Sequence, residues 1–482
     1  MAFELKQRMW AVVSVVLSGA MYFLGSGLHP HWYLTWFAPL PLLLVAPRVG
    51  VWGAFLSACA AYAIGGMNMW QYFRGLEMPL GVVLFIVLGP AVFFGLILLA
   101  FRRFALRGQL FLAMASFPLL WVAFQYLQEF RSVHSTFGNL AYTQMDFVPV
   151  LQIASLTGIW GIGFLLFLFP AAIAVFFLPG PAVEKRRAAT VAGVILGAAL
   201  GYGVYRLHVT GNASGDAPRV TVGLIATDGA KTLFPRSAGT LDLVRQYAAH
   251  VPDLTARGAQ VVIIPEKIGR ISGADLEQAD SILEATAREQ RVTISASFEH
   301  SPNLNETRLY SPDGTLEATY EKHHMLPPFE SHLLEGTSRV SVERPSGRWG
   351  MQICKDMDFP QLSRQYGNEG AGLMLVPAWD FATDGWLHGR MAILRGVESG
   401  FSIARAPKQG VLTVTDDRGR VLAERDTGSA PFAAIVASVP VRNERTLYDR
   451  AGDWFAWLDL VLSALLLASL FFARRSVRDV AA

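Results

Sequence analysis

The chain has 482 residues, of which 52% are hydrophobic and 16% are charged, and its mean hydropathy is +0.35. This length exceeds that of one ordinary domain, and so apolar a composition excludes a wholly soluble protein, so part of the chain is expected to lie in lipid. The formal net charge is only +3, and the basic residues form short clusters between apolar stretches, which argues against nucleic acid as the main partner.

The first 210 residues predict a bundle of membrane-spanning helices, since a helix needs roughly 20 apolar residues to cross a hydrocarbon core of ~30 Å. The N-terminal stretch has no clear small-residue cleavage site, so we expect a retained helix and not a signal peptide. The second stretch is short and contains Pro39 and Pro41, so it could be broken or half-inserted, with its backbone groups satisfied inside the bundle. The eight predicted spans are Met9–Leu28, Trp32–Ala46, Val51–Trp70, Met78–Phe101, Gln109–Gln128, Ile159–Leu178, Ala188–Leu207 and Trp454–Ala473.

The positions of Lys and Arg in the short loops predict the orientation of the bundle. If all eight segments span, basic clusters fall at every second boundary: Lys6/Arg8, Arg48, Arg102/Arg103/Arg107, Lys185/Arg186/Arg187 and Arg474/Arg475/Arg478. Both termini are then cytoplasmic. We therefore predict a membrane bundle over 1–210, an extracytoplasmic domain over 211–453, and a final helix with a cytoplasmic tail over 454–482.

Residues 211–453 predict a layered α/β domain with mixed sheets, because short β-rich runs alternate with helical stretches. Hairpin-like pairs flank Pro312-Asp313-Gly314 and Asp417-Arg418-Gly419. Helices are predicted at Thr240–Ala256, Ala274–Glu289 and Trp386–Ser399. Strands are predicted at Val220–Ala226, Val261–Pro265, Val292–Phe298, Arg308–Tyr310, Gly350–Cys354, Leu373–Val376, Val411–Val414 and Ala433–Val439.

Three motifs in this domain place a reactive side chain after a strand or a turn. Glu266 follows Val261-Val-Ile-Ile-Pro265, Lys322 follows the turn at Asp313-Gly314, and Cys354 ends Gly350-Met-Gln-Ile. A lone cysteine at a strand end is more often an inert small hydrophobe, and a single Glu or Lys is usually a surface residue. Together they form a catalytic set: the carboxylate takes the thiol proton, the thiolate attacks a carbonyl, and the ammonium stabilises the oxyanion.

The remaining cysteine and the histidines predict no further chemistry. Cys59 lies in an apolar segment, so no disulfide framework is expected and Cys354 is expected to be a free thiol. The histidines at His29, His31, His300 and His323-His324 lack the paired spacing with a glutamate that a zinc helix shows. We therefore expect neither a metal ion nor a cofactor.

With these motifs the soluble domain resembles the carbon–nitrogen hydrolase (nitrilase) superfamily, and the whole chain resembles the bacterial apolipoprotein N-acyltransferases. Beyond the three reactive residues, the resemblance rests on Leu17–Pro47, Gly138–Gln144 (GNLAYTQ), Leu151–Gly161 (LQIASLTGIWG) and Thr446–Phe455 (TLYDRAGDWF). The last of these motifs is not expected of soluble nitrilases. The fold that the resemblance implies is an αββα sandwich on a bundle of about eight transmembrane helices.

The resemblance also implies roles for five residues. Glu266 corresponds to the general base, Lys322 to the oxyanion stabiliser, and Cys354 to the nucleophile that becomes a thioester. Glu330 matches a second glutamate that supports the lysine, and Asp356 stands where the family commonly has an acidic residue; without the resemblance both read as solvated loop charges.

The family's reaction is two-step acyl transfer. The resemblance implies a phospholipid acyl donor and, as acceptor, the α-amino group of the lipid-modified N-terminal cysteine of an apolipoprotein. The implied location is the bacterial inner membrane, with the catalytic domain on the periplasmic face. The outer loop Glu129–Pro149, which contains Phe130, Phe137, Tyr142 and Phe147, would flank the path of the acyl chain or anchor the protein at the interface.

Several departures from the family lie close to the predicted site. Lys355 stands in place of an aromatic residue, where it could lower the thiol pKa, meet a lipid phosphate, or face solvent. The other departures are Ala226-Thr227-Asp228, Pro327-Pro328-Phe329-Glu330, Pro377-Ala378-Trp379-Asp380-Phe381 and Pro407-Lys408-Gln409-Gly410. Two alternatives therefore stay open: an enzyme with the same nucleophile but water or another amine as acceptor, and a non-catalytic protein that uses the nitrilase fold to bind lipoproteins or a partner subunit.

Overall fold

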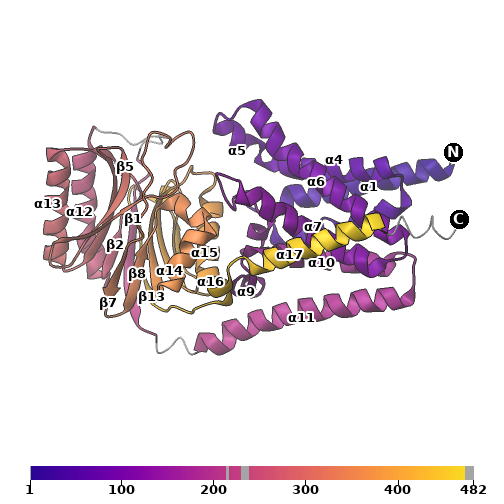
Figure 1. Ribbon diagram of the computed structural model, residues 1–482. Helices are drawn as coiled ribbons and strands as arrows, with labels where there is room; N and C mark the ends of the chain where they lie inside the picture. The colour runs from indigo at the N-terminus through magenta and orange to yellow at the C-terminus, as the bar shows by residue number, and fades with distance from the viewer. Residues whose placement is uncertain (1, 213–216, 230–237, 473–482) are drawn as a thin grey trace. The chain divides into compact units, whose positions relative to one another are not determined.

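The structure, a computed structural model, describes residues 2–212, 217–229 and 238–472 (Figure 1), and the chain divides into two units. The helical unit comprises Met1–Ser132, Gly138–Val204 and Asp453–Ala482, and the α/β unit comprises Val133–Phe137 and Tyr205–Gly452. The α/β unit therefore includes five residues from a loop between two helices of the helical unit.

The helical unit consists of long apolar helices joined by short helical segments. The longer helices are α1 (Ala2–Gly25), α4 (Val51–Gly66), α6 (Leu80–Leu106), α7 (Leu110–Phe130), α10 (Ile159–Phe177), α11 (Ala182–Asn212) and α17 (Trp454–Phe472). The short segments are α2 (Trp32–Thr35), α3 (Leu40–Val45), η1 (Ala46–Arg48), η2 (Met67–Met69), α5 (Trp70–Gly75), η3 (Leu140–Gln144), α8 (Val148–Leu151) and α9 (Ala154–Thr157).

In the described part of the chain, five helical stretches are long and apolar enough to cross a membrane, judged by length and composition: Arg8–Gly25, Leu80–Leu106, Leu110–Phe130, Ile159–Phe177 and Ala182–His208. Helix α4 is shorter, with 16 residues, and the apolar part of α17 is Trp454–Leu470. Large hydrophobic side chains such as Trp10, Phe85 and Val194 are exposed on these helices, as lipid contact requires. The chain is a membrane protein.

The predicted span Trp32–Ala46 is broken into α2 and α3. The buried Gln144 side chain donates to the Trp32 carbonyl at 3.0 Å and accepts from the Trp36 indole at 2.6 Å. The Arg102 guanidinium donates to the Ala46 carbonyl at 2.9 Å. Side chains from other parts of the bundle thus satisfy the polar groups that a broken helix exposes in lipid.

Two of the stretches on which the family resemblance rests meet inside the helical unit. The Trp160 indole donates to the Asp453 carboxylate at 2.9 Å, and the Trp454 indole donates to the Leu156 carbonyl at 2.7 Å. Two hydrogen bonds therefore join the start of α17, where the chain re-enters the bundle, to the segment Leu151–Gly161.

The α/β unit contains two mixed sheets. The first has the strand order β13-β1-β2-β4-β5-β6, with β3 paired to β4, and the second has the order β12-β11-β10-β9-β8-β7. The first-sheet strands are β1 (Arg219–Ala226), β2 (Val261–Ile263), β3 (Arg270–Ile271), β4 (Thr293–His300), β5 (Leu304–Tyr310), β6 (Leu316–Glu321) and β13 (Ala433–Pro440). The second-sheet strands are β7 (Ser341–Arg344), β8 (Gly347–Met351), β9 (Ala371–Trp379), β10 (Ser402–Lys408), β11 (Val411–Thr415) and β12 (Val421–Asp426).

The helices of this unit cover the outer faces of the two sheets, as Figure 1 shows. They are α12 (Thr240–Ala256), α13 (Ala274–Gln290), α14 (Pro360–Asn368), α15 (Gly385–Ser399) and α16 (Leu447–Ala451), with the short turns η5 (Cys354–Asp358) and η6 (Thr427–Ser429). Alternate residues of β2 point to opposite sides: Val261 and Ile263 belong to the core between the sheets, whereas Val262 packs under α12 and α13. The predicted αββα sandwich is confirmed.

The parallel strands at the centre of each sheet bring the sequence motifs together. Strands β1, β2 and β4 are parallel in the first sheet, and β8, β9 and β10 are parallel in the second. Glu266 follows β2 and Cys354 follows β8. The N–H of Glu266 donates to the Ala378 carbonyl of β9 at 3.2 Å, so the carboxyl ends of the two sheets adjoin at this point.

Candidate active site

Cys354 lies on a tight turn directly after strand β8. Its backbone φ is +44°, in the left-handed region that residues with a Cβ rarely adopt. The side chain is partly buried, and its Sγ lies 3.5 Å from the Trp379 carbonyl oxygen at the end of β9. Such a turn holds the thiol at the rim of the second sheet, next to the end of β9.

Glu266, Lys322 and Glu330 form a buried ion-pair chain. The Lys322 ammonium donates to Glu266 Oε1 at 2.8 Å and to Glu330 Oε2 at 2.7 Å. All three side chains are at most 4% exposed, so water screens these contacts very little. The structure thus brings together the carboxylates and the ammonium that the sequence motifs singled out.

Two further residues complete this cluster, and the sequence analysis missed both. Lys267 forms an ion pair with Glu330 Oε1, and the Asn305 amide donates to Glu266 Oε1 at 2.6 Å and to Glu330 Oε1 at 3.2 Å. Lys267 immediately follows Glu266 in the sequence, so its position could have indicated that it belongs to the site. Asn305 comes from β5 and gives no local signal, because its role depends on the pairing of distant strands.

Burial and charge together set the protonation of the site. Burial raises the pKa of the Cys354 thiol well above its usual range, and the Glu266 charge adds to this, while Lys322 opposes it. For Lys322 burial lowers the pKa, but Glu266 and Glu330 outweigh burial and hold the pKa well above its usual range. For Glu330 burial raises the pKa, and Lys322 and Lys267 more than offset this, so the pKa is lowered. At neutral pH the site therefore holds a neutral thiol beside a charged ammonium.

Asp356 accepts hydrogen bonds both from the segment around Lys322 and from the turn that carries Cys354. One carboxylate oxygen accepts from the backbone N–H of His323 at 3.2 Å and of His324 at 2.9 Å. The other accepts from the Tyr320 hydroxyl at 2.7 Å and from the Ile353 N–H at 3.1 Å. Because the carboxylate is fully buried, it holds two reactive segments in a fixed relation.

Lys355 does not face solvent. Its side chain is 5% exposed, with its ammonium 3.2 Å from His134 Nδ1 and 3.5 Å from Asp358 Oδ2. Phe359 lies under the ammonium, with 5.5 Å between Nζ and the ring centroid. His134 belongs to the loop segment Val133–Phe137, so Lys355 ties that segment to the turn that carries the nucleophile.

A second group of charged residues surrounds the ends of β9 and β10, where the sequence departs from the family. Arg405 forms two hydrogen bonds to Asp380, at 2.8 and 2.5 Å, and both side chains are buried. The Lys408 ammonium lies 3.3 Å from the centroid of the Trp379 ring and donates to the Lys267 carbonyl at 2.7 Å. Burial, with Lys267 nearby, lowers the pKa of Lys408 to about 7.

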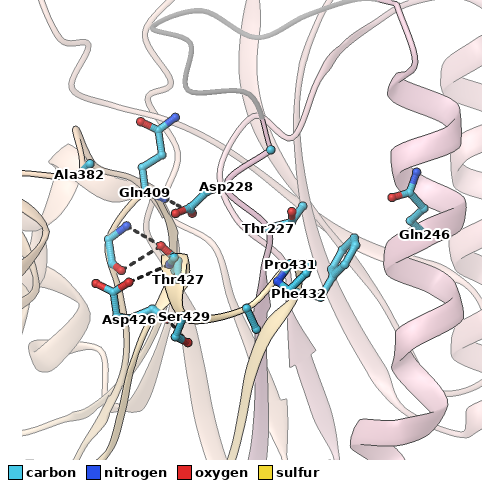
Figure 2. Close-up of a pocket in the computed structure, with 14 residues that line it drawn as sticks. Thr227, Asp228, Gln246, Ala382, Gln409, Asp426, Thr427, Ser429, Pro431 and Phe432 are labelled. Atoms are coloured by element: carbon cyan, nitrogen blue, oxygen red, sulfur yellow. Dashed lines mark hydrogen bonds between the residues drawn. The ribbon is translucent and has the colours of Figure 1, made fainter.

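Two other departures meet in a polar pocket of about 880 Å³, shown in Figure 2. Asp228 accepts a hydrogen bond from the backbone N–H of Gln409 at 2.7 Å, and the Thr427 hydroxyl is bonded to the backbone of Gly410. Glu266, Lys322 and Cys354 are not among its lining residues. Among the described residues no group of three or more His, Cys, Asp or Glu side chains is arranged to hold a metal ion.

Comparison with known proteins gives matches to both units. The family model of the apolipoprotein N-acyltransferase N-terminal domain matches residues 18–172, and that of carbon–nitrogen hydrolases matches residues 235–430. The apolipoprotein N-acyltransferase of Geobacter metallireducens is 28% identical, over 98% of this chain and 96% of that protein. The protein of the same name from Gloeobacter violaceus is 26% identical, over 90% of this chain and 88% of that protein.

Among solved structures, an amidase from Nesterenkonia sp. is similar, with a TM-score of 0.42 and 19% identity. The match covers 49% of this chain and 95% of the amidase.

Proposed function

We infer that this chain belongs to the apolipoprotein N-acyltransferase family, because its two parts match the family's N-terminal domain and the carbon–nitrogen hydrolases, and because its similarity to proteins of that name covers nearly the whole chain. It accordingly transfers an acyl chain from a phospholipid to the N-terminal amino group of a lipoprotein. A thioester on Cys354 is the intermediate, and Glu266 and Lys322 assist its formation and its breakdown.

In the first half-reaction the Cys354 thiol gives its proton to Glu266 as sulfur attacks an ester carbonyl of the phospholipid. The resulting oxyanion develops beside the Lys322 ammonium, which stays charged because Glu266 and Glu330 raise its pKa. Collapse of this intermediate breaks the carbon–oxygen bond, and the glycerol oxygen leaves with the proton held by Glu266. The products are the thioester and a lysophospholipid.

In the second half-reaction the free α-amino group of the acceptor attacks the thioester carbonyl. Glu266 takes a proton from the attacking nitrogen, and Lys322 again stabilises the oxyanion. Collapse forms the amide and expels the Cys354 sulfur, which recovers its proton from Glu266. Splitting the transfer in this way replaces one difficult step with two easier ones.

The observation that carries the proposal is the buried chain Glu266–Lys322–Glu330 next to the strained turn of Cys354. Burying three charged groups is costly, and a scaffold for binding alone would not need them. Because the thiol is neutral at rest, its activation requires a base, and the Glu266 carboxylate interacts electrostatically with the thiol.

The experiment is to supply phospholipid without an acceptor and to measure the mass of the intact protein. We expect one acyl mass on Cys354 that neutral hydroxylamine removes, because thioesters react with that nucleophile much faster than oxygen esters. Cys354→Ala should lose the adduct, and Glu266→Ala should slow its formation by roughly 10²–10⁴-fold. An adduct on Cys59 alone, or an active Cys354→Ala variant, would rule out the mechanism.

The same assay separates the proposed acceptor from water and from other amines. The thioester should persist until a peptide with a lipid-modified N-terminal cysteine is added, and should then disappear with formation of the amide. Rapid decay of the adduct in buffer alone would instead indicate that water is the acceptor and that the protein is a membrane hydrolase.

A further inference from the structure

The helical unit contains an apolar crevice of about 480 Å³ that the proposed reaction does not use. Its walls come from α7, α9, α10, α11 and α17. Most of the lining is apolar, with side chains such as Leu119, Leu156, Phe164, Ala199 and Phe455. A ligand of this crevice must therefore be largely apolar, and its volume is in the range of small-molecule sites.

Helix α11 is fixed as one wall of the crevice by contacts near its end. The Tyr202 hydroxyl is 2.7 Å from the Ser155 hydroxyl, between α11 and α9. At Gly203 a Cβ would come within 1.9 Å of the Pro149 carbonyl oxygen, so this position requires glycine for the close approach of the two segments. These contacts place the end of α11 beside the crevice.

Asp459 on α17 lines the crevice and is 2% exposed. No side chain among the residues that the structure describes donates a hydrogen bond to either of its carboxyl oxygens. The backbone N–H of Ala123 on α7 interacts with the carboxyl group. A buried carboxyl group with so few partners in an apolar surrounding is destabilising, and an ionisable residue within a membrane helix is by default a candidate functional site.

The depth of Asp459 indicates which part of a lipid it can meet. It lies five residues after Trp454, which corresponds to about 7.5 Å along the helix. The Trp454 indole is held by the Leu156 carbonyl at 2.7 Å, and tryptophan favours the membrane–water interface. Asp459 is therefore below the headgroups, at the level of the glycerol backbone.

At that depth a diacyl phospholipid offers only ester oxygens, which accept hydrogen bonds. A lysophospholipid offers a free glycerol hydroxyl, which donates, next to the remaining ester. An ionised carboxylate only accepts, and a protonated carboxyl both donates and accepts, so in either state the acceptor oxygens of Asp459 need a donor. We propose that the crevice binds a lysophospholipid, with its chain against the apolar walls and its free hydroxyl on Asp459.

This assignment rests on the proposed function, in which a lysophospholipid is the product of the first half-reaction. It adds a separate holding site for that product within the helical unit. The site would keep the released lipid bound at the protein after it has left Cys354.

The test is native mass spectrometry of the full-length protein in detergent, titrated with lysophosphatidylethanolamine and, separately, with diacyl phosphatidylethanolamine. Asp459→Leu should weaken binding of the lysolipid by about tenfold, the effect of one lost buried hydrogen bond. Asp459→Asn, which keeps a donor and an acceptor, should bind within about threefold of the wild type. Binding of the diacyl lipid should be the same in all three proteins.

Ser463→Ala is the matched control, because Ser463 is a buried polar residue one turn further along α17 that does not line the crevice. Equal lysolipid affinity in Asp459→Leu and wild type would overturn the assignment, as would an equal loss for the diacyl lipid. The assay for the acyl adduct on Cys354 of the wild type tests the proposed reaction independently of lysolipid binding. A normal adduct with unchanged lysolipid binding in Asp459→Leu refutes only the holding site, whereas absence of the adduct refutes the proposed reaction.

Discussion

At the scale of single residues, Cys354 provides a direct test of the site's electrostatics. Burial and the Glu266 charge raise the pKa of its thiol, so the thiolate forms only at alkaline pH. We predict that the rate of alkylation of Cys354 by iodoacetamide, in a Cys59→Ala background, rises with a midpoint above the ordinary thiol value of about 8.5. Glu266→Gln should move this midpoint to lower pH, because it removes a negative charge that disfavours the thiolate. A midpoint at or below the ordinary value would contradict this account.

Glu330 gives a second prediction at this scale, one of stability. Its pKa is lowered by Lys322 and Lys267, so its ion pairs stabilise the fold above the unfolded pKa of about 4.3 and are lost as the pH falls below it. Glu330→Gln leaves two buried ammonium groups with one carboxylate fewer, and should cost about 3–5 kcal/mol in free energy of unfolding at neutral pH.

Thermal unfolding of the two proteins between pH 7 and pH 2 checks this. The difference in melting temperature should stay nearly constant down to about pH 4.3 and should shrink as the pH falls further, towards the lowered pKa of Glu330. The exposed Glu335, five residues further along the same loop, is the control position, and Glu335→Gln should unfold like the wild type. A difference that does not depend on pH would show that Glu330 acts through packing alone.

At the scale of elements, Asp356 joins the β6–Lys322 segment to the η5 turn. Asp356→Ala removes the acceptor for the Tyr320 hydroxyl and for three backbone N–H groups, together with the contact to the His324 ring, so Lys322 should lose its position relative to Cys354. A misplacement of about 1 Å can cost about 10²-fold in rate, and we predict a loss of this size in the rate of thioester formation.

Two readouts separate positioning from unfolding in this variant. Asp356→Asn keeps an acceptor oxygen and should recover part of the rate. The plateau rate of Cys354 alkylation, at a pH above the pKa of the thiol, should be nearly unchanged in Asp356→Ala, because the thiol is then already ionised without help from Lys322. A wild-type rate of thioester formation in Asp356→Ala would contradict the proposed positioning.

The elements also show what local sequence patterns can predict. Helix α12 was predicted with its observed bounds, and β1, β4 and β13 were predicted to within two residues at each end, since each has an uninterrupted period and clear turn residues around it. Strand β10 was missed. It carries Arg405 and Pro407 in a strand that is buried except at its last residue. The buried charge of Arg405 is tolerated because Asp380, which follows the neighbouring strand, forms an ion pair with it.

The candidate site, like the fold, could be predicted from the sequence only in part. Glu266, Lys322 and Cys354 each follow a strand or a turn, and a strand end is visible in the sequence. The partners Asn305 and His134 are not, because β5 and the loop Val133–Phe137 reach the site only through tertiary structure. For the predicted span Trp32–Ala46 the prolines indicated a possible break, but its partners Gln144 and Arg102 lie far away in sequence and could not be predicted.

At the scale of the whole molecule, the prediction concerns the face of the membrane on which the α/β unit lies. The basic clusters at Arg48 and Arg102 lie at the same end of the bundle, because the Arg102 guanidinium donates to the carbonyls of Ala46 and Val49. The broken segment therefore brings the chain back towards the end of the bundle at which α6 ends, as a full crossing would. This agrees with cytoplasmic termini and with residues 211–453 outside the cytoplasm.

Reporter fusions in a Gram-negative host test this orientation. Alkaline phosphatase, which is active only outside the cytoplasm, should be active when fused after Ser214 and inactive when fused after Gly108, beside the basic residues between α6 and α7. A reporter that is active only in the cytoplasm should give the opposite pattern at both points. An inactive phosphatase after Ser214 would exclude the predicted orientation, and with it the periplasmic location expected of the catalytic domain.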